Sequence, residues 1–172
     1  MSLQDPVSPT ASAPPELLRL HEYWRGRCAQ ADVPDRGDID PVDMAFCLPH
    51  LAVIELEPDP FRPRYRLVGS RLVDLFGREL TGCYVDEVYR GSVRKEALAA
   101  YRQTAEGRQP LYSRRTLHGL FRSYSYDRLM LPLRRGGDRI EQILLGLYPT
   151  DRQLVTAEQW RVEEDVRNFT TL

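Results

Sequence analysis

The chain has 172 residues, 42% of them hydrophobic and 28% charged, which suits one packed domain of ordinary size and excludes a chain that is disordered throughout. Lysine and arginine together number 24 and aspartate and glutamate 25, so the net charge of −1 lacks the basic surplus typical of nucleic-acid-binding proteins. No stretch approaches the ~18 consecutive apolar residues of a membrane span, and the N-terminus lacks the apolar core of a secretory signal, so we expect a cytoplasmic protein with no membrane or nucleic-acid partner.

The first part of the chain combines a polar segment with helical patterns. Residues 1–14 are rich in Pro, Ser and Ala and predict a flexible tail. A helix is predicted next, because four apolar residues recur at helical spacing: Leu17, Leu20, Trp24 and Cys28. Asp40 and Pro41 have the pattern of an N-cap and a first helical residue, and they predict a short helix that ends before Pro49.

The middle of the chain alternates between strand and helix patterns. Residues 51–56 and 64–69 predict two strands, the second of which alternates apolar and charged side chains. A short helix is predicted over 71–76 with Ser70 as its cap, and a longer helix over 92–107.

The last part of the ordered pattern predicts three consecutive strands. Residues 111–118, 121–133 and 140–148 are rich in aromatic and branched side chains and are separated by short turns, so neighbouring strands must be antiparallel. Pro132 indicates a bulge or an edge position in the second of them. Residues 151–172 are expected to form a C-terminal extension with a short helix. The whole order predicts an α+β fold with an antiparallel sheet and helices on one face.

Three runs of the sequence resemble the PAS domain family. The runs are DPVDMAFCLPHLAVIEL (40–56), RYRLVGSRLVDLFGRELTGCYVDEV (64–88) and SYDRLMLPLRRGGDRIEQILLGLYP (125–149), and they are similar to the bacterial subgroup of short, stand-alone PAS-domain proteins. The resemblance covers roughly residues 15–150. It implies a five-stranded antiparallel sheet curved around a small cavity, a flanking N-terminal helix, and a sensory or interaction role without catalysis. It implies no particular ligand.

Residues that could carry metal, cofactor or catalytic chemistry are few. The only histidines, His21, His50 and His118, have no metal-ligand spacing, and the long central helix lacks the histidine that haem-binding PAS domains usually place there. Cys83 and the other two cysteines lie far apart and outside any flavin-type motif, which predicts free thiols. We therefore expect no metal and no cofactor. A small enzyme that uses His50 or Cys83 is the least favoured of three functional hypotheses.

A ligand pocket is expected between the inner face of the sheet and the helices of residues 70–107. Side chains on one face recur every second residue in a strand and every three or four residues in a helix. On that basis nine residues are predicted to line the pocket: Tyr65, Leu67, Arg71, Leu72, Phe76, Tyr101, Leu129, Leu131 and Leu145. Arg71 is preferred over Arg66 and Arg128 as the group at the mouth that would bind a small organic acid with an apolar body.

The favoured functional hypothesis is a sensor that binds a small molecule and acts through contacts with a protein partner. The alternative is an interaction module whose core is filled and binds no ligand. Residues 15–30 are predicted to mediate a homodimer, because the domain that follows can cover only part of the apolar stripe. The competing interpretation is that this helix packs across its own sheet.

Overall fold

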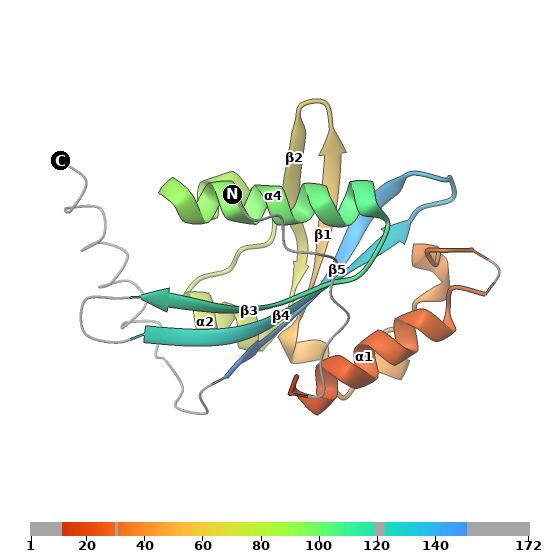
Figure 1. Ribbon diagram of the computed structural model, residues 1–172, viewed down its shortest axis with the longest axis horizontal. Coiled ribbons are helices and arrows are strands. Elements are labelled where there is room, and N and C mark those ends of the chain that lie inside the picture. Colours follow the sequence, from red (N-terminus) through yellow and green to blue (C-terminus); the bar gives the residue numbers. More distant parts are fainter. Residues whose placement is uncertain (1–11, 30, 119–122, 151–172) are drawn as a thin grey trace.

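A five-stranded antiparallel sheet in the order β2-β1-β5-β4-β3 forms the centre of the structure (Figure 1). The structure is a computed structural model that describes residues 12–29, 31–118 and 123–150; most of the predicted tail and the predicted C-terminal extension lie outside these residues. The sheet confirms the predicted fold class. Its strands are β1 (Leu51–Pro58), β2 (Phe61–Val68), β3 (Leu111–His118), β4 (Ser123–Arg134) and β5 (Ile140–Pro149).

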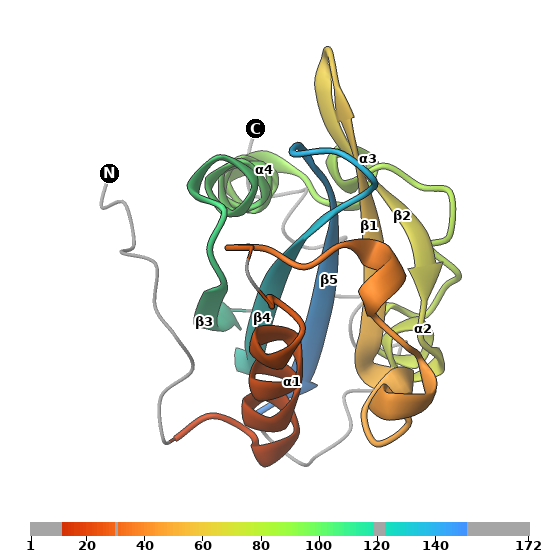
Figure 2. The ribbon, with the colours of Figure 1, turned by 90° about the vertical axis from the view of Figure 1, so that its right-hand side faces the viewer.

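Helices cover both faces of this sheet, whereas the order of elements predicted helices on one face; the flanking N-terminal helix occupies the second face. The α-helices are α1 (Pro15–Gly26), α2 (Ser70–Phe76), α3 (Val85–Val88) and α4 (Gly91–Gly107), and 3₁₀ turns lie at Arg36–Asp38, Val42–Met44 and Leu48–His50. The flanking helix α1 lies over β4 and β5 on one face, while α4 covers the other (Figure 2). The predicted short helix before Pro49 is wrong in type, because this segment forms two separate 3₁₀ turns.

The apolar stripe of α1 is buried against the sheet of its own chain. Leu17 and Leu20 are fully buried, and a Cβ on Gly146 of β5 would lie 2.8 Å from Leu17 Cδ2, so the helix approaches the strand as closely as glycine allows. Trp24 is also buried, and its Nε1 donates a hydrogen bond to the Pro132 carbonyl oxygen at 2.9 Å. These contacts agree with the interpretation in which the helix packs across its own sheet.

Pro132 lies on a local edge of the sheet, as predicted. The pairing of β3 with β4 ends at Leu111 and Met130, so the side of β4 that faces away from β5 has no strand partner at residue 132. A proline that lacks the N–H is tolerated at such a position. The Trp24 indole covers this edge and supplies the donor for its free carbonyl group.

A bulge in β2 reverses the expected alternation of that strand. Val53 pairs with Leu67 but Ile54 pairs with Tyr65, so Arg66 is an extra residue on the β2 side. Tyr65 is therefore buried at 1% exposure while Leu67 is 59% exposed. The prediction that Tyr65 and Leu67 share a face is wrong for this reason.

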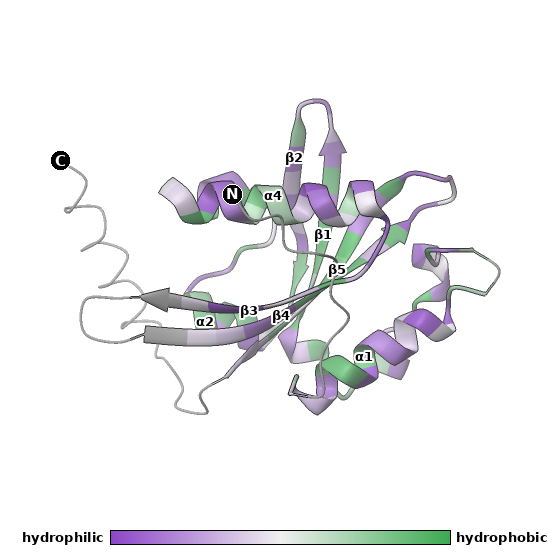
Figure 3. Cartoon of the chain, in the orientation of Figure 1, coloured by the Kyte–Doolittle hydropathy of each residue, from purple (hydrophilic) through white to green (hydrophobic). Residues whose placement is uncertain are grey.

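Hydropathy follows the same layers. Figure 3 shows hydrophobic residues through the middle of the sheet and hydrophilic residues at the tip of the β1–β2 hairpin, with both kinds along α1 and α4. Both amphipathic helices bury their apolar side on the sheet, in α4 through Ala97, Ala100 and Tyr101. None of the described helices has the length and apolar character that a membrane span requires.

Candidate ligand-binding site

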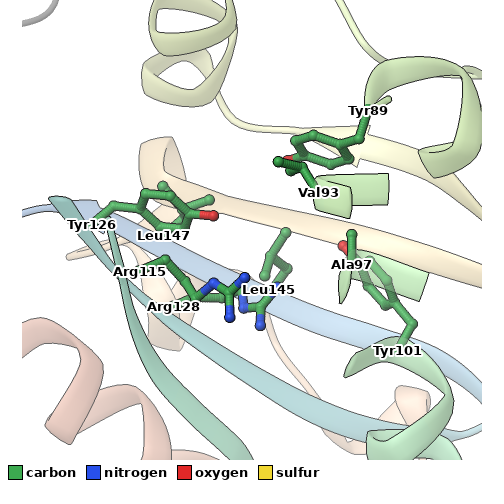
Figure 4. A pocket seen from close by; sticks show the side chains of 9 residues that line it. All are labelled: Tyr89, Val93, Ala97, Tyr101, Arg115, Tyr126, Arg128, Leu145 and Leu147. Atoms are coloured by element: carbon green, nitrogen blue, oxygen red, sulfur yellow. The ribbon is translucent and has the colours of Figure 1, made fainter. Parts of the chain in front are cut away.

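A hollow lies between α4 and the face of the sheet that α1 does not cover (Figure 4). The empty space measures about 430 Å³ when the part that opens to solvent is included. The cavity volume itself is about 20 Å³, enough for about one water molecule. The wall combines apolar, tyrosine and arginine side chains. Its residues are Tyr89, Val93, Ala97, Tyr101, Arg115, Tyr126, Arg128, Leu145 and Leu147.

The register of strands β3, β4 and β5 determines which of their side chains face the hollow. Arg128 of β4 pairs with Leu147 of β5 on one side and with Ser113 of β3 on the other, so these three side chains share one face. Arg115 pairs with Tyr126 two residues further along the same face. Arg115 and Arg128 are therefore diagonal neighbours, a separation that long side chains can bridge.

The two arginines differ in how their charges are compensated. Arg115 forms an ion pair with Glu96 of α4. Arg128 is 8% exposed, its Nε donates a hydrogen bond to Ser113 Oγ at 3.2 Å, and it forms no ion pair with a carboxylate of the described residues. A buried guanidinium without a counter-ion is unusual, because removing a charge from water costs several kcal/mol unless it is paired.

Tyrosine hydroxyls surround the same space. Figure 4 shows Tyr89, Tyr101 and Tyr126 around the two arginines. Hydrogen bonds link the hydroxyl of Tyr65, next to the hollow, to those of Tyr89 and Tyr101. Burial raises the pKa of Tyr65, Tyr89 and Tyr101 above the usual range, so these hydroxyls stay protonated and can donate hydrogen bonds.

Comparison with known proteins assigns the family. A family model described as PAS domain (PAS_5) matches residues 12–148. The chain belongs to the PAS domain family. The family predicted from the three sequence runs is thus confirmed.

A solved PAS domain shares this architecture. It is the PAS domain from Bordetella pertussis BvgS, with a TM-score of 0.51 and 17% sequence identity over 73% of this chain and 93% of that chain. At this identity the likeness concerns the fold alone. No curated protein matches the chain.

Four of the nine predicted site residues lie in or beside the hollow of this PAS domain. Tyr101 and Leu145 line it. Tyr65 hydrogen-bonds to the lining tyrosines, and the ring of Phe76 packs edge-on against Tyr89 with ring centres 6.2 Å apart.

The other five predicted residues lie elsewhere. Leu72 is buried in the core but is not part of the wall, and Leu67 is turned outward by the β2 bulge. Arg71 is on the surface, with its side chain 55% exposed and its Nη1 3.8 Å from Asp74 Oδ2. It is therefore not at the mouth of the hollow.

Leu129 and Leu131 are buried on the opposite face of β4. They pair with Gly146 and Leu144 of β5, and Gly146 faces α1. Their expected place in the pocket is wrong, because the alternate residues Tyr126 and Arg128 face the hollow instead.

Several lining residues were not predicted for the site, although some were recognisable. The sequence offers Arg128 for the mouth of the pocket only behind Arg71, and no pattern in the sequence singles out Arg115. The available signal was a charged residue directly before the apolar run of β4: in a strand covered on both faces, an arginine at the start of such a run indicates a special environment on its face. Tyr89, Val93 and Ala97 come from α4 and the segment before it and could not be assigned without the helix orientation.

The other candidate groups lie away from this hollow. His50 Nδ1 is 3.3 Å from the Leu147 carbonyl oxygen, and its ring stacks on Tyr148 with centres 4.1 Å apart; burial lowers the pKa of His50. Neither His50 nor Cys83 belongs to the wall. Among the described residues no group of three or more His, Cys, Asp and Glu side chains is placed to hold a metal ion.

Proposed function

We propose that this PAS domain is a non-enzymatic sensory module that binds a small molecule in the hollow and signals through contacts with a protein partner. Membership of the PAS family indicates the sensory or signalling role. The observation that supports ligand binding is the convergence of two arginines and three tyrosines on a hollow whose other four lining residues are aliphatic. Apolar walls with a few converging polar groups are typical of small-molecule sites.

One observation favours the alternative of an interaction module without a ligand. The cavity volume of about 20 Å³ accommodates about one water molecule, so side chains must move to admit a molecule larger than water. A ligand for this site must therefore be small, or the wall must open around it.

A thermal-shift screen of small organic compounds tests ligand binding. A compound at ~100 times its Kd stabilises by about 2.7 kcal/mol, which raises the Tm of a protein of this size by about 5–10 °C. Ala97→Leu places a larger side chain in the hollow and should remove this shift, whereas Ala99→Leu on the exposed side of the same helix should keep it.

Circular dichroism would show that both variants retain the fold. The proposal fails if no compound stabilises the wild-type chain, or if every hit stabilises the Ala97→Leu variant as strongly as the wild type. The first result would favour the interaction module.

A homodimer through residues 15–30 stays a prediction. The buried residues of α1 pack on their own sheet, so the surface available for such a contact is the other side of the helix, with Arg19, Glu22 and Arg25. Light scattering of the full chain over a range of concentrations tests it, with an Arg19→Glu and Arg25→Glu double variant expected to dissociate the dimer. A monomeric mass for the wild type at every concentration would exclude this contact.

A cytoplasmic location is also proposed. The three cysteines, Cys28, Cys47 and Cys83, are free thiols, which is typical of proteins in reducing compartments. Cell fractionation tests the location, and recovery from an extracytoplasmic fraction would contradict it.

A further inference from the structure

We propose that the hollow binds a small monocarboxylate and that Arg128 holds the carboxylate group. The inference rests on the proposed function, since it names the chemical class of ligand for the same site. It is drawn from the charge of the wall, from the hydrogen-bonding groups around Arg128 and from the size of the space.

The side chains that line the hollow carry one positive charge without a counter-ion, which favours a ligand with one negative charge. Two of the nine lining residues are arginines, and none is an acid. The Glu96 carboxylate compensates Arg115, whereas Arg128 has no carboxylate partner among the described residues. One uncompensated positive charge in this wall is matched by a singly charged anion, and a dianion would leave an excess negative charge in the same space.

The geometry around Arg128 suits a planar anion. Its Nε is held by Ser113 Oγ, which fixes the plane of the guanidinium group, and no hydrogen bond from its terminal nitrogens to another described side chain is seen. A guanidinium group presents paired N–H donors that match the two oxygens of a carboxylate. Tyr65 has a single O–H and can donate to only one of Tyr89 and Tyr101, so at most one of these two hydroxyls can also donate to the same oxygens.

The apolar part of the wall suits a short aliphatic body. Val93 and Ala97 of α4 face Leu145 and Leu147 of β5 across the hollow. The free space has room for about one water molecule, so the wall must open even for a short acid, and the shortest acids require the smallest movement. Acetate, propionate and butyrate are therefore suitable probes.

Isothermal titration of the full chain with these three acids and with their neutral amides tests the inference. At least one acid should bind, and its amide should bind at least about tenfold more weakly, since a hydrogen bond to a charged group contributes about 1.5–3 kcal/mol. Arg128→Gln should weaken binding of the acid by at least about tenfold. The matched control Arg71→Gln removes an exposed arginine of equal charge and should leave the affinity unchanged.

Each other outcome has a defined meaning. If the amides, or other neutral compounds from the thermal-shift screen, bind in the hollow as tightly as the acids, the carboxylate assignment is wrong while the proposed function stands. If nitrate or phosphate binds as tightly as the acids, the site binds anions in general and the carboxylate assignment is also wrong. If no compound of any kind binds, both proposals fail.

A second variant keeps the test decisive if Arg128→Gln does not fold. Arg128→Lys retains the charge but not the paired donors of the guanidinium group. It should bind the acid about tenfold more weakly. Unchanged affinity in a folded Arg128→Lys variant would overturn the role assigned to Arg128.

Discussion

Replacing Trp24 with alanine should lower the free energy of unfolding by about 3–5 kcal/mol, a large part of the stability of an ordinary domain. The indole is 4% exposed and packs between α1 and β4. Its loss leaves a cavity and also leaves the Pro132 carbonyl oxygen without the donor that lies 2.9 Å away. Both effects act at the contact that attaches α1 to the sheet.

Urea denaturation followed by circular dichroism measures this change. Arg25→Ala on the exposed side of the same helix is the matched control and should alter the free energy of unfolding by less than about 0.5 kcal/mol. A loss of less than about 1 kcal/mol for Trp24→Ala would show that α1 is weakly attached, and the helix would then be free to contact another molecule.

The strands and long helices could be predicted because their signals are local. The three strands of residues 111–149 are long, rich in branched side chains and separated by short turns, and their predicted bounds differ from those in the structure by at most two residues. The apolar stripe of α1 likewise follows from helical spacing alone. Which partner covers that stripe depends on contacts over more than a hundred residues, such as that between Trp24 and Pro132, and no local pattern contains this information.

Local irregularities account for most of the differences. The bulge at Arg66 changes which side chains of β2 face inward, although the sequence of this strand reads as regular alternation. Helix α3 is a single turn of four residues, too short to show a helical period. Helix α4 ends with Arg108 in the left-handed conformation, whereas the prediction relied on the glycine before it.

The site was only partly predictable for a different reason. Both faces of β4 are covered, one by α1 and the other by α4, so leucines alone could not show which face borders the hollow. Leu129 and Leu131 look like pocket residues because they are apolar, yet the hollow is bordered by the face that carries Tyr126 and Arg128. The alternate positions of Tyr126 and Arg128 were the better guide, because they place a tyrosine and an arginine on one face.

Replacing Arg128 with methionine should stabilise the chain in the absence of a ligand. Methionine has a similar length and no charge, so it avoids the cost of keeping a guanidinium group out of water without a counter-ion. We expect a gain of about 1–2 kcal/mol, or a rise in Tm of about 2–8 °C. The gain is at the lower end of what such replacements give, because Ser113 Oγ, which is buried, loses its hydrogen-bond partner.

Thermal denaturation with and without the acid that binds in the titration separates a ligand-binding role of Arg128 from a structural one. Without the acid, the wild-type chain should be less stable than Arg128→Met. With the acid, the wild-type chain should gain stability and Arg128→Met should not. A buried binding residue is expected to lower the stability of the ligand-free protein when only the ligand neutralises its charge. If Arg128→Met instead lowers Tm, the guanidinium group stabilises the fold itself. That result would assign Arg128 a structural role and would contradict the prediction that its buried charge destabilises the ligand-free protein.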